Sequence, residues 1–166
     1  MRYSLIFLFL IICSACGAQK EKNEVKSERI ALDQPRYNNP LQVATWTFSA
    51  QSTNEADVYL IQAKLSLAND WHIFDFEPGG DGYLIAPEIS FTTEGLSVLS
   101  KKAVGNLVSA KLAGMEKEVR YFENEVSFEL RVRSKHKELK GSIYYQLCDH
   151  EKCLAPTDEP FTLTLK

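Results

Sequence analysis

The sequence predicts an all-β fold, a sandwich of two β-sheets, and three observations support this prediction. Many short segments alternate between apolar and polar residues, as strands with one buried face do. These segments recur roughly every 8–12 residues, which is the spacing of a sandwich or barrel. No segment keeps a helical period with capping residues at both ends. A folded part of roughly 130 residues is long enough to bury such strands between two packed sheets.

The first residues of the chain resemble an export signal. Arg2 supplies a positive start, and residues 5–12 are an apolar run that suits a signal segment but is too short to cross a bilayer. The next residues, Cys13-Ser14-Ala15-Cys16, resemble a bacterial lipobox, although Cys13 stands where Leu is usual. We therefore expect a signal peptide over residues 1–15 and a lipid on Cys16. An ordinary signal peptide cut nearby is the alternative.

Residues 16–35 are expected to be a flexible tether. They lack an apolar period and alternate in charge, so they favour a solvated chain that holds the following domain, residues 36–166, off a membrane surface. The whole chain has a formal net charge of -3. This charge argues against a nucleic-acid partner, because nucleic-acid-binding domains usually carry a basic patch.

The folded part begins with two strongly alternating segments. In residues 43–49, Trp46 and Phe48 share one face, with polar residues between them, and residues 57–67 alternate in the same way. The glycine-rich stretch 78–82 predicts a loop. The other predicted strands are residues 71–74, 89–91, 96–99, 121–122, 126–132, 141–148 and 161–165. The aromatic residues expected in the core are Trp46, Trp71 and Phe74.

One pair of cysteines, Cys148 and Cys153, lies in the part of the chain expected to fold. In an exported protein such a pair can form a disulfide. The four residues between them are polar or charged and predict an exposed turn. Directly opposed strand residues have Cα atoms about 4.5–5.5 Å apart, which a disulfide accepts. The strand before the turn places Tyr145 and Leu147 on one face and Tyr144, Gln146 and Cys148 on the other.

The residues alone leave the role of this pair open. A disulfide that closes so short a loop stabilises a domain by roughly 2 kcal/mol or less, which favours chemistry over stapling. His150 and Lys152 could stabilise a thiolate, whereas Asp149 and Glu151 oppose one. A redox pair and a structural disulfide therefore remain equally supported by composition and spacing.

Two other chemistries have little support in the sequence. A zinc site would need Cys148, His150 and Cys153 together with His72 or His136, and the spacing does not fit known zinc motifs. We therefore expect no metal and no other cofactor, and we expect His72 to be a structural or surface residue. A hydrolase is not supported either, because no nucleophile motif with a placed base is present.

Several segments, in order, resemble the periplasmic N-terminal domain of the thiol:disulfide interchange protein DsbD. The specific pieces are Tyr-Gln-Leu-Cys at residues 145–148 and Cys-Leu-Ala-Pro at residues 153–156, followed by the terminal strand 161–165. Weaker matching pieces lie at residues 46–48, 71–74 and 121–128. The resemblance covers residues 38–166.

The resemblance implies an immunoglobulin-like sandwich that faces the periplasm and relays electrons. Cys148 and Cys153 would be the exchanging pair, with Cys153 forming the mixed disulfide and Cys148 resolving it. The implied partners are periplasmic thioredoxin-like oxidoreductases and a membrane-embedded electron donor. Tyr144, Gln146 and His150 are expected around the pair. The alternative is a non-enzymatic binding module of a cell-envelope lipoprotein with a structural disulfide, because sandwiches of this kind host many functions.

The sequence also departs from the family pattern. Well-known members have one more residue between the cysteines, and they cover the pair with a loop that carries aromatic residues. The matching stretch here is residues 112–116, in which Met115 is the expected cover, with an ordinary packed or exposed methionine as the alternative. No membrane-spanning or thioredoxin-like segment follows Lys166, so the electron donor is expected to be a separate protein.

Overall fold

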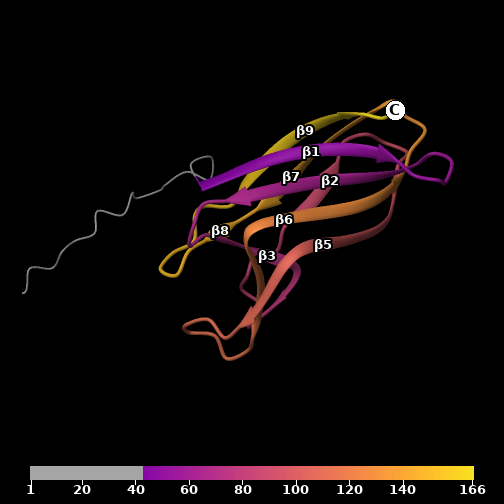
Figure 1. Ribbon diagram of the computed structural model, residues 1–166. Helices are drawn as coiled ribbons and strands as arrows, with labels where there is room; N and C mark the ends of the chain where they lie inside the picture. The colour runs from indigo at the N-terminus through magenta and orange to yellow at the C-terminus, as the bar shows by residue number, and fades with distance from the viewer. Residues whose placement is uncertain (1–42) are drawn as a thin grey trace, which may run out of the picture. The chain divides into compact units, whose positions relative to one another are not determined.

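The computed structural model describes residues 43–166, which form nine strands in two antiparallel sheets (Figure 1). The larger sheet has the order β1-β2-β6-β3-β8, and β5 also pairs with β6. The smaller sheet has the order β4-β7-β9. The strands are β1 (Ala44–Ser52), β2 (Val58–Leu67), β3 (His72–Gly79), β4 (Glu88–Phe91), β5 (Ser97–Ala110), β6 (Val119–Arg133), β7 (Glu138–Tyr145), β8 (Leu147–Cys148) and β9 (Thr157–Thr164). The all-β sandwich predicted from the sequence is confirmed.

Three parts of the sequence prediction concern residues that precede the described range. The signal peptide, the lipidated Cys16 and the tether over residues 16–35 lie outside the described residues. Within residues 43–166, no helix is long and apolar enough to cross a bilayer.

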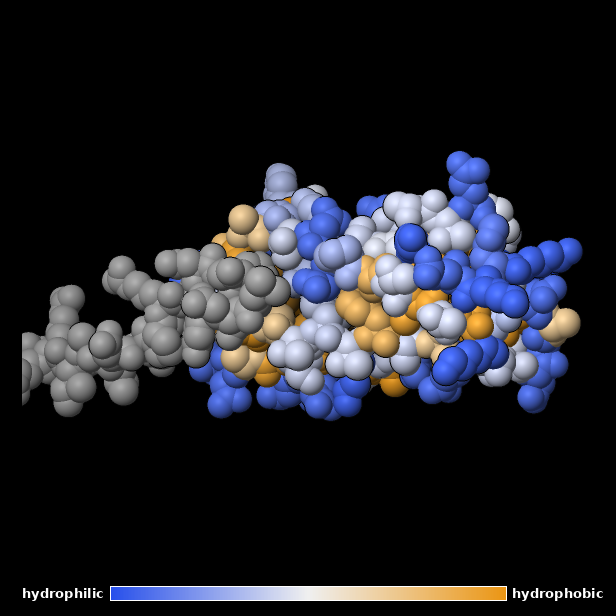
Figure 2. All heavy atoms as spheres, turned by 90° about the horizontal axis from the view of Figure 1, so that it is seen from above, coloured by the Kyte–Doolittle hydropathy of each residue, from blue (hydrophilic) through white to orange (hydrophobic). Residues whose placement is uncertain are grey.

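The core lies between the two sheets. Phe128 of β6 and Leu65 of β2 meet Ile143 and Tyr145 of β7 in one buried cluster. Aromatic rings also bridge the sheets: the ring centroids of Phe48 and Phe161 lie 4.7 Å apart, and those of Trp46 and Tyr145 lie 5.1 Å apart. Seen from above, the side of β1 and β9, apolar surface shows in patches between hydrophilic side chains (Figure 2). The alternation that predicted the strands therefore separates an apolar interior from a mostly polar exterior.

Strand β6 is continuous, which corrects the prediction of two strands around Glu123 and Asn124. The chain passes through this point with Asn124 in a left-handed conformation, at a φ of 62°. Asn tolerates this conformation better than most residues, so it permits an irregularity inside a strand. The two halves of β6 have different neighbours: β2 pairs with Glu125 to Arg133, and β3 pairs with residues at and before Glu123.

Strand β5 is much longer than the predicted segment 96–99. It runs for 14 residues along β6, and nearly all of its side chains are exposed. Among the described strands β5 pairs with β6 alone, so it forms an edge of the larger sheet. An edge strand with few buried side chains shows no alternation of apolar and polar residues, and the sequence therefore carries little signal for it.

The predicted strand 141–148 is divided between the two sheets. Strand β7 ends at Tyr145 and pairs with β4 and β9, whereas Leu147 and Cys148 pair with β3 in the larger sheet. Tyr145 and Leu147, which the alternation predicted to share a face, are both buried in the core. The chain changes sheets at Gln146, and this change carries Cys148 to the larger sheet.

Candidate functional site

Cys148 and Cys153 face each other across a short hairpin and are joined by a disulfide. Their Cα atoms are 4.0 Å apart, somewhat closer than the separation expected of opposed strand residues. The bridge predicted for this pair is therefore present.

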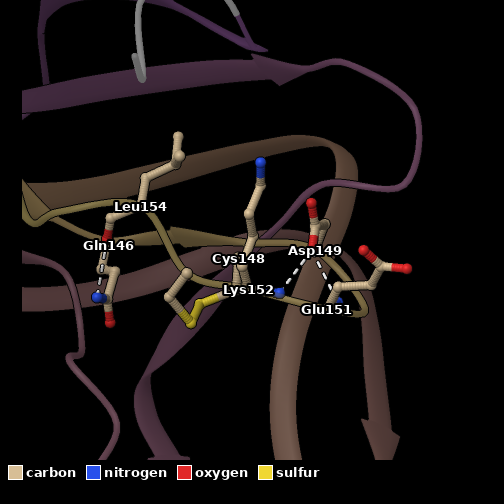
Figure 3. Close-up of a disulfide and its surroundings, with 7 residues drawn as sticks. Gln146, Cys148, Asp149, Glu151, Lys152 and Leu154 are labelled. Carbon is tan, nitrogen blue, oxygen red and sulfur yellow. Dashed lines mark hydrogen bonds between the residues drawn. A yellow bond between two sulfur atoms is a disulfide. The ribbon is translucent and has the colours of Figure 1, made fainter. Parts of the chain in front are cut away.

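The turn between the cysteines is held by Asp149. One carboxylate oxygen, Oδ1, accepts hydrogen bonds from the backbone N–H groups of Glu151 and Lys152, both at 2.8 Å (Figure 3). The Asp149 N–H also donates to the Lys152 carbonyl at 2.8 Å. The sequence predicts Asp149 as a charge that opposes a thiolate. In the structure its carboxylate shapes the loop.

Gln146 ties together the two chain segments at the base of the hairpin. Its side-chain Nε2 donates to the carbonyl of Leu154 at 2.9 Å (Figure 3). The Leu154 N–H donates to the Leu147 carbonyl at 2.8 Å, and the Leu154 side chain is buried in the core. Gln146 therefore braces the point where the chain changes sheets. Tyr144, also expected near the pair, lies in β7 of the smaller sheet and is 37% exposed.

The two cysteines differ sharply in exposure. Cys148 is only 2% exposed, whereas Cys153 lies on the surface. Cys148 belongs to a small apolar cluster on the larger sheet, and Met115 is one of the half-buried residues that pack against it. The buried members are Phe74, Val119, Tyr121 and Cys148, and the half-buried residues over them include Leu84, Leu112 and Met115.

This cluster lies on the face of the larger sheet that turns away from the core. Ile73 of β3 is paired with Phe122 of β6 and with Leu147 of β8, and all three side chains are buried between the sheets. Side chains alternate between faces along a strand. The neighbouring residues therefore point the other way, into the cluster that holds Cys148. We call these two surfaces of β3, β6 and β8 the inner face and the outer face.

His72 is the residue at this site whose position the sequence did not reveal. It is 3% exposed and lies directly opposite Cys148 in the pairing of β3 with β8. Its ring packs against those of Tyr121 and Phe74, with centroid distances of 4.7 and 5.4 Å. The sequence showed only a histidine beside Trp71 in a strand, and the strand pairing was needed to bring it to the cysteine.

Charges around the hairpin act on His72. The pKa of His72 is lowered from 6.5 to about 4, chiefly by burial and then by the nearby His150, while Asp149 acts in the opposite direction. The imidazole is therefore neutral at pH 7. His150 itself is exposed on the turn and lines a small polar hollow of about 300 Å³ with Asp70 and Glu123.

The described residues offer no metal site. No group of three or more His, Cys, Asp or Glu side chains in residues 43–166 is arranged to hold a metal ion. A larger hollow of about 540 Å³ lies between β3 and β5, and its lining includes Phe76, Lys101, Leu107 and Arg120 but neither cysteine. The groups at the hairpin that can exchange electrons or protons include the two sulfur atoms and the imidazole of His72, which is paired opposite Cys148.

Comparison with known proteins finds one matching family model. Residues 38–165 match the family model described as thiol:disulfide interchange protein DsbD, N-terminal. No curated protein matches the sequence significantly.

Two solved structures share the fold. The N-terminal periplasmic domain of ScsB from Proteus mirabilis aligns with a TM-score of 0.58 and 23% identity, over 74% of this chain and 46% of that one. The N-terminal domain of Neisseria meningitidis DsbD, solved in its reduced form, aligns with a TM-score of 0.53 and 12% identity, over 76% of this chain and 88% of that one.

Proposed function

The chain belongs to the family of DsbD N-terminal domains, and from this premise we propose that it relays electrons through Cys148 and Cys153 to oxidised thioredoxin-like partners. The family identifies a thiol:disulfide interchange module with an immunoglobulin-like fold. The observation that carries the finer proposal is the difference in exposure between the two sulfur-bearing residues.

Thiol–disulfide exchange needs one accessible sulfur and one that acts within the protein. A thiolate attacks a disulfide sulfur and forms a mixed disulfide, which a second thiolate then resolves. Cys153 is exposed and can meet a partner, whereas Cys148 is shielded by the outer-face cluster. We therefore assign the partner-attacking role to Cys153 and the resolving role to Cys148, in agreement with the roles implied by the family resemblance.

The proposed placement in the cell rests on the family and on the leader sequence. DsbD N-terminal domains are periplasmic, and the leader predicts export. We propose that residues 1–15 are removed, that Cys16 carries the lipid, and that residues 16–35 tether the domain of residues 36–166 to a membrane. The reducing equivalents would then come from a separate membrane-embedded protein.

A binding module with a purely structural disulfide is the second candidate. The hairpin is already held without the disulfide, because Asp149 shapes its turn and Gln146 braces its base. The disulfide also closes a loop of only five residues' separation, so its contribution to stability is small. Both observations favour thiol–disulfide exchange over a purely structural role for the disulfide.

Trapping with single-cysteine variants tests the proposal. A Cys148→Ser variant should form a mixed disulfide with a thioredoxin-like protein that has an oxidised Cys-x-x-Cys site, and acid quenching should preserve it, because Cys148 can no longer resolve it and the quench protonates the partner's freed thiolate. A Cys153→Ser variant should trap little, since its remaining sulfur is shielded. The double variant is the control. No capture by either single variant, together with a reduction potential below about -300 mV, would instead identify a structural disulfide.

A further inference from the structure

His72 is a buried polar side chain that lacks hydrogen bonds to the described residues. Neither ring nitrogen has a hydrogen-bond partner within residues 43–166, although the side chain is only 3% exposed. A buried polar atom left unpaired costs roughly 1–3 kcal/mol, and most native proteins avoid this cost. Phenylalanine or leucine would fill an apolar site without it. A histidine at this position therefore indicates a chemical role rather than a packing role.

The strand pairing places His72 directly opposite Cys148. Opposed residues of antiparallel strands place their side chains on the same face, and His72 is opposed by Cys148 on β8 and by Glu123 on β6. The rings of Tyr121 and Phe74 limit the movement of the imidazole.

The titratable groups around His72 come from two elements besides its own strand. Asp149 and His150 of the hairpin act on it electrostatically, and β6 contributes Tyr121 and Glu123. Asp149 is occupied by the backbone of the turn, and His150 is exposed. The imidazole is thus a buried, neutral group on the same face as Cys148, at the position directly opposite it in the strand pairing.

We propose that His72 accepts the proton of the Cys148 thiol when Cys148 resolves the mixed disulfide. This proposal rests on the exchange function proposed above. Burial of Cys148 disfavours a free thiolate, because a charge inside the protein loses its hydration. A neutral imidazole on the same face as the sulfur can take the proton as the sulfur attacks. In the disulfide form the lowered pKa of His72 keeps the ring neutral, and the negative charge that develops on the Cys148 sulfur during attack favours the protonated ring.

The complete exchange needs no reactant besides the cysteine pair, His72 and the partner's disulfide. The Cys153 thiolate attacks one sulfur of the partner's disulfide, that disulfide breaks, and its other sulfur leaves as a thiolate. The Cys148 proton then passes to His72 while the Cys148 sulfur attacks Cys153. The Cys148–Cys153 bond forms, the bond between Cys153 and the partner breaks, and the partner's second sulfur leaves as a thiolate that takes up the proton. The pair loses two electrons, and the partner's disulfide gains them.

The test separates the two exchange steps in the full chain with Cys13 and Cys16 both changed to Ser, so that oxidised glutathione, the probe, reacts at Cys148 and Cys153 alone. In a Cys148→Ser background, adding His72→Phe should leave the rate of mixed-disulfide formation within twofold. With Cys148 present, His72→Phe should slow release of the second glutathione about 100-fold at pH 7, the usual size of a general-base contribution. His136→Phe, which changes an exposed histidine, is the matched control and should leave both rates within twofold.

The pH dependence distinguishes proton transfer from packing. The resolution rate of the native chain should be nearly level between pH 5 and pH 8, because a neutral imidazole is available throughout. In the His72→Phe variant the rate should rise about tenfold per pH unit, since hydroxide must then remove the proton. Equal rates and equal slopes in the two proteins would overturn the proposal.

A second variant keeps the test usable if the first does not fold. An NMR measurement on the native chain gives an independent readout. If His72→Phe does not fold, His72→Gln removes the titrating group while keeping a polar side chain, and it should show the same loss and slope. In the native chain, the NMR signals of the His72 ring should shift between the disulfide and dithiol forms. Unchanged signals would overturn the proposal. Failure of Cys148→Ser to form any mixed disulfide would overturn the exchange function itself, a separate result.

Discussion

The inner and outer faces of β3, β6 and β8 are built on the same strands but are covered in different ways. On the inner face, Ile73, Phe122 and Leu147 are covered by the strands of the smaller sheet. On the outer face, Cys148, with His72 opposite it, lies in a cluster whose half-buried cover comes from the edge strand β5 and from connecting segments, the latter including Leu112 and Met115.

Because of this difference in covering, we expect the inner face to contribute stability and the outer face to allow access to the disulfide. Strands that are hydrogen-bonded into a second sheet cannot move away from the inner face without disrupting that sheet. Loop residues lack this constraint and open at lower cost. Under the proposed function, the outer face can bury the resolving sulfur and still admit a partner, whereas the inner face serves to stabilise the fold. The following three changes test this division.

The largest effect is expected on the inner face. Phe122→Ala should lower the free energy of unfolding by about 3–5 kcal/mol, because it leaves a cavity between two sheets that cannot close around it. Chemical denaturation of the disulfide form measures the change. Val104→Ala, on the exposed side of β5, is the control and should change stability by less than about 0.5 kcal/mol. A loss below about 1 kcal/mol in Phe122→Ala would mean that the inner face is not the rigid one.

An intermediate effect is expected from pH on the outer face. The pKa of His72 is about 4 in the folded chain and 6.5 as its ordinary value, so the unfolded chain binds more protons between these pH values. The free energy of unfolding should therefore fall as the pH drops from 6.5 to 4, by about 3 kcal/mol from this residue. Denaturation of the disulfide form at pH 4 and pH 7 measures the change. In His72→Phe the difference should shrink by this amount, and an unaltered pH dependence would contradict the assignment.

The smallest effect on stability is expected in the covering loop. Met115→Ala should change the free energy of unfolding by less than about 1 kcal/mol, because the side chain is only half-buried. The disulfide should nevertheless be reduced several-fold faster by dithiothreitol, since access to the sulfur atoms improves. Tyr83→Ala, which truncates a side chain that is 84% exposed, is the control. Equal reduction rates in the two variants would show that Met115 does not shield the pair.

Local alternation predicted most of the strands because it reflects a local property. A residue and its second neighbour share a face in any strand, so Trp46 with Phe48 and Tyr145 with Leu147 could be placed together without knowledge of the fold. The same logic failed for β5, which has no buried face to alternate with, and for β6, where Asn124 looked like a turn but lies inside a strand.

The sequence by itself predicted the all-β class, the family resemblance and a possible bridge between Cys148 and Cys153, because these depend on residue pattern and on neighbours close along the chain. Only the tertiary structure decided that Gln146 marks a change of sheet, that Cys148 is buried while Cys153 is exposed, and that His72 lies opposite Cys148. These features depend on the pairing of strands from distant parts of the sequence. Such pairing is set by the packing of the whole sandwich, and no short segment carries that information.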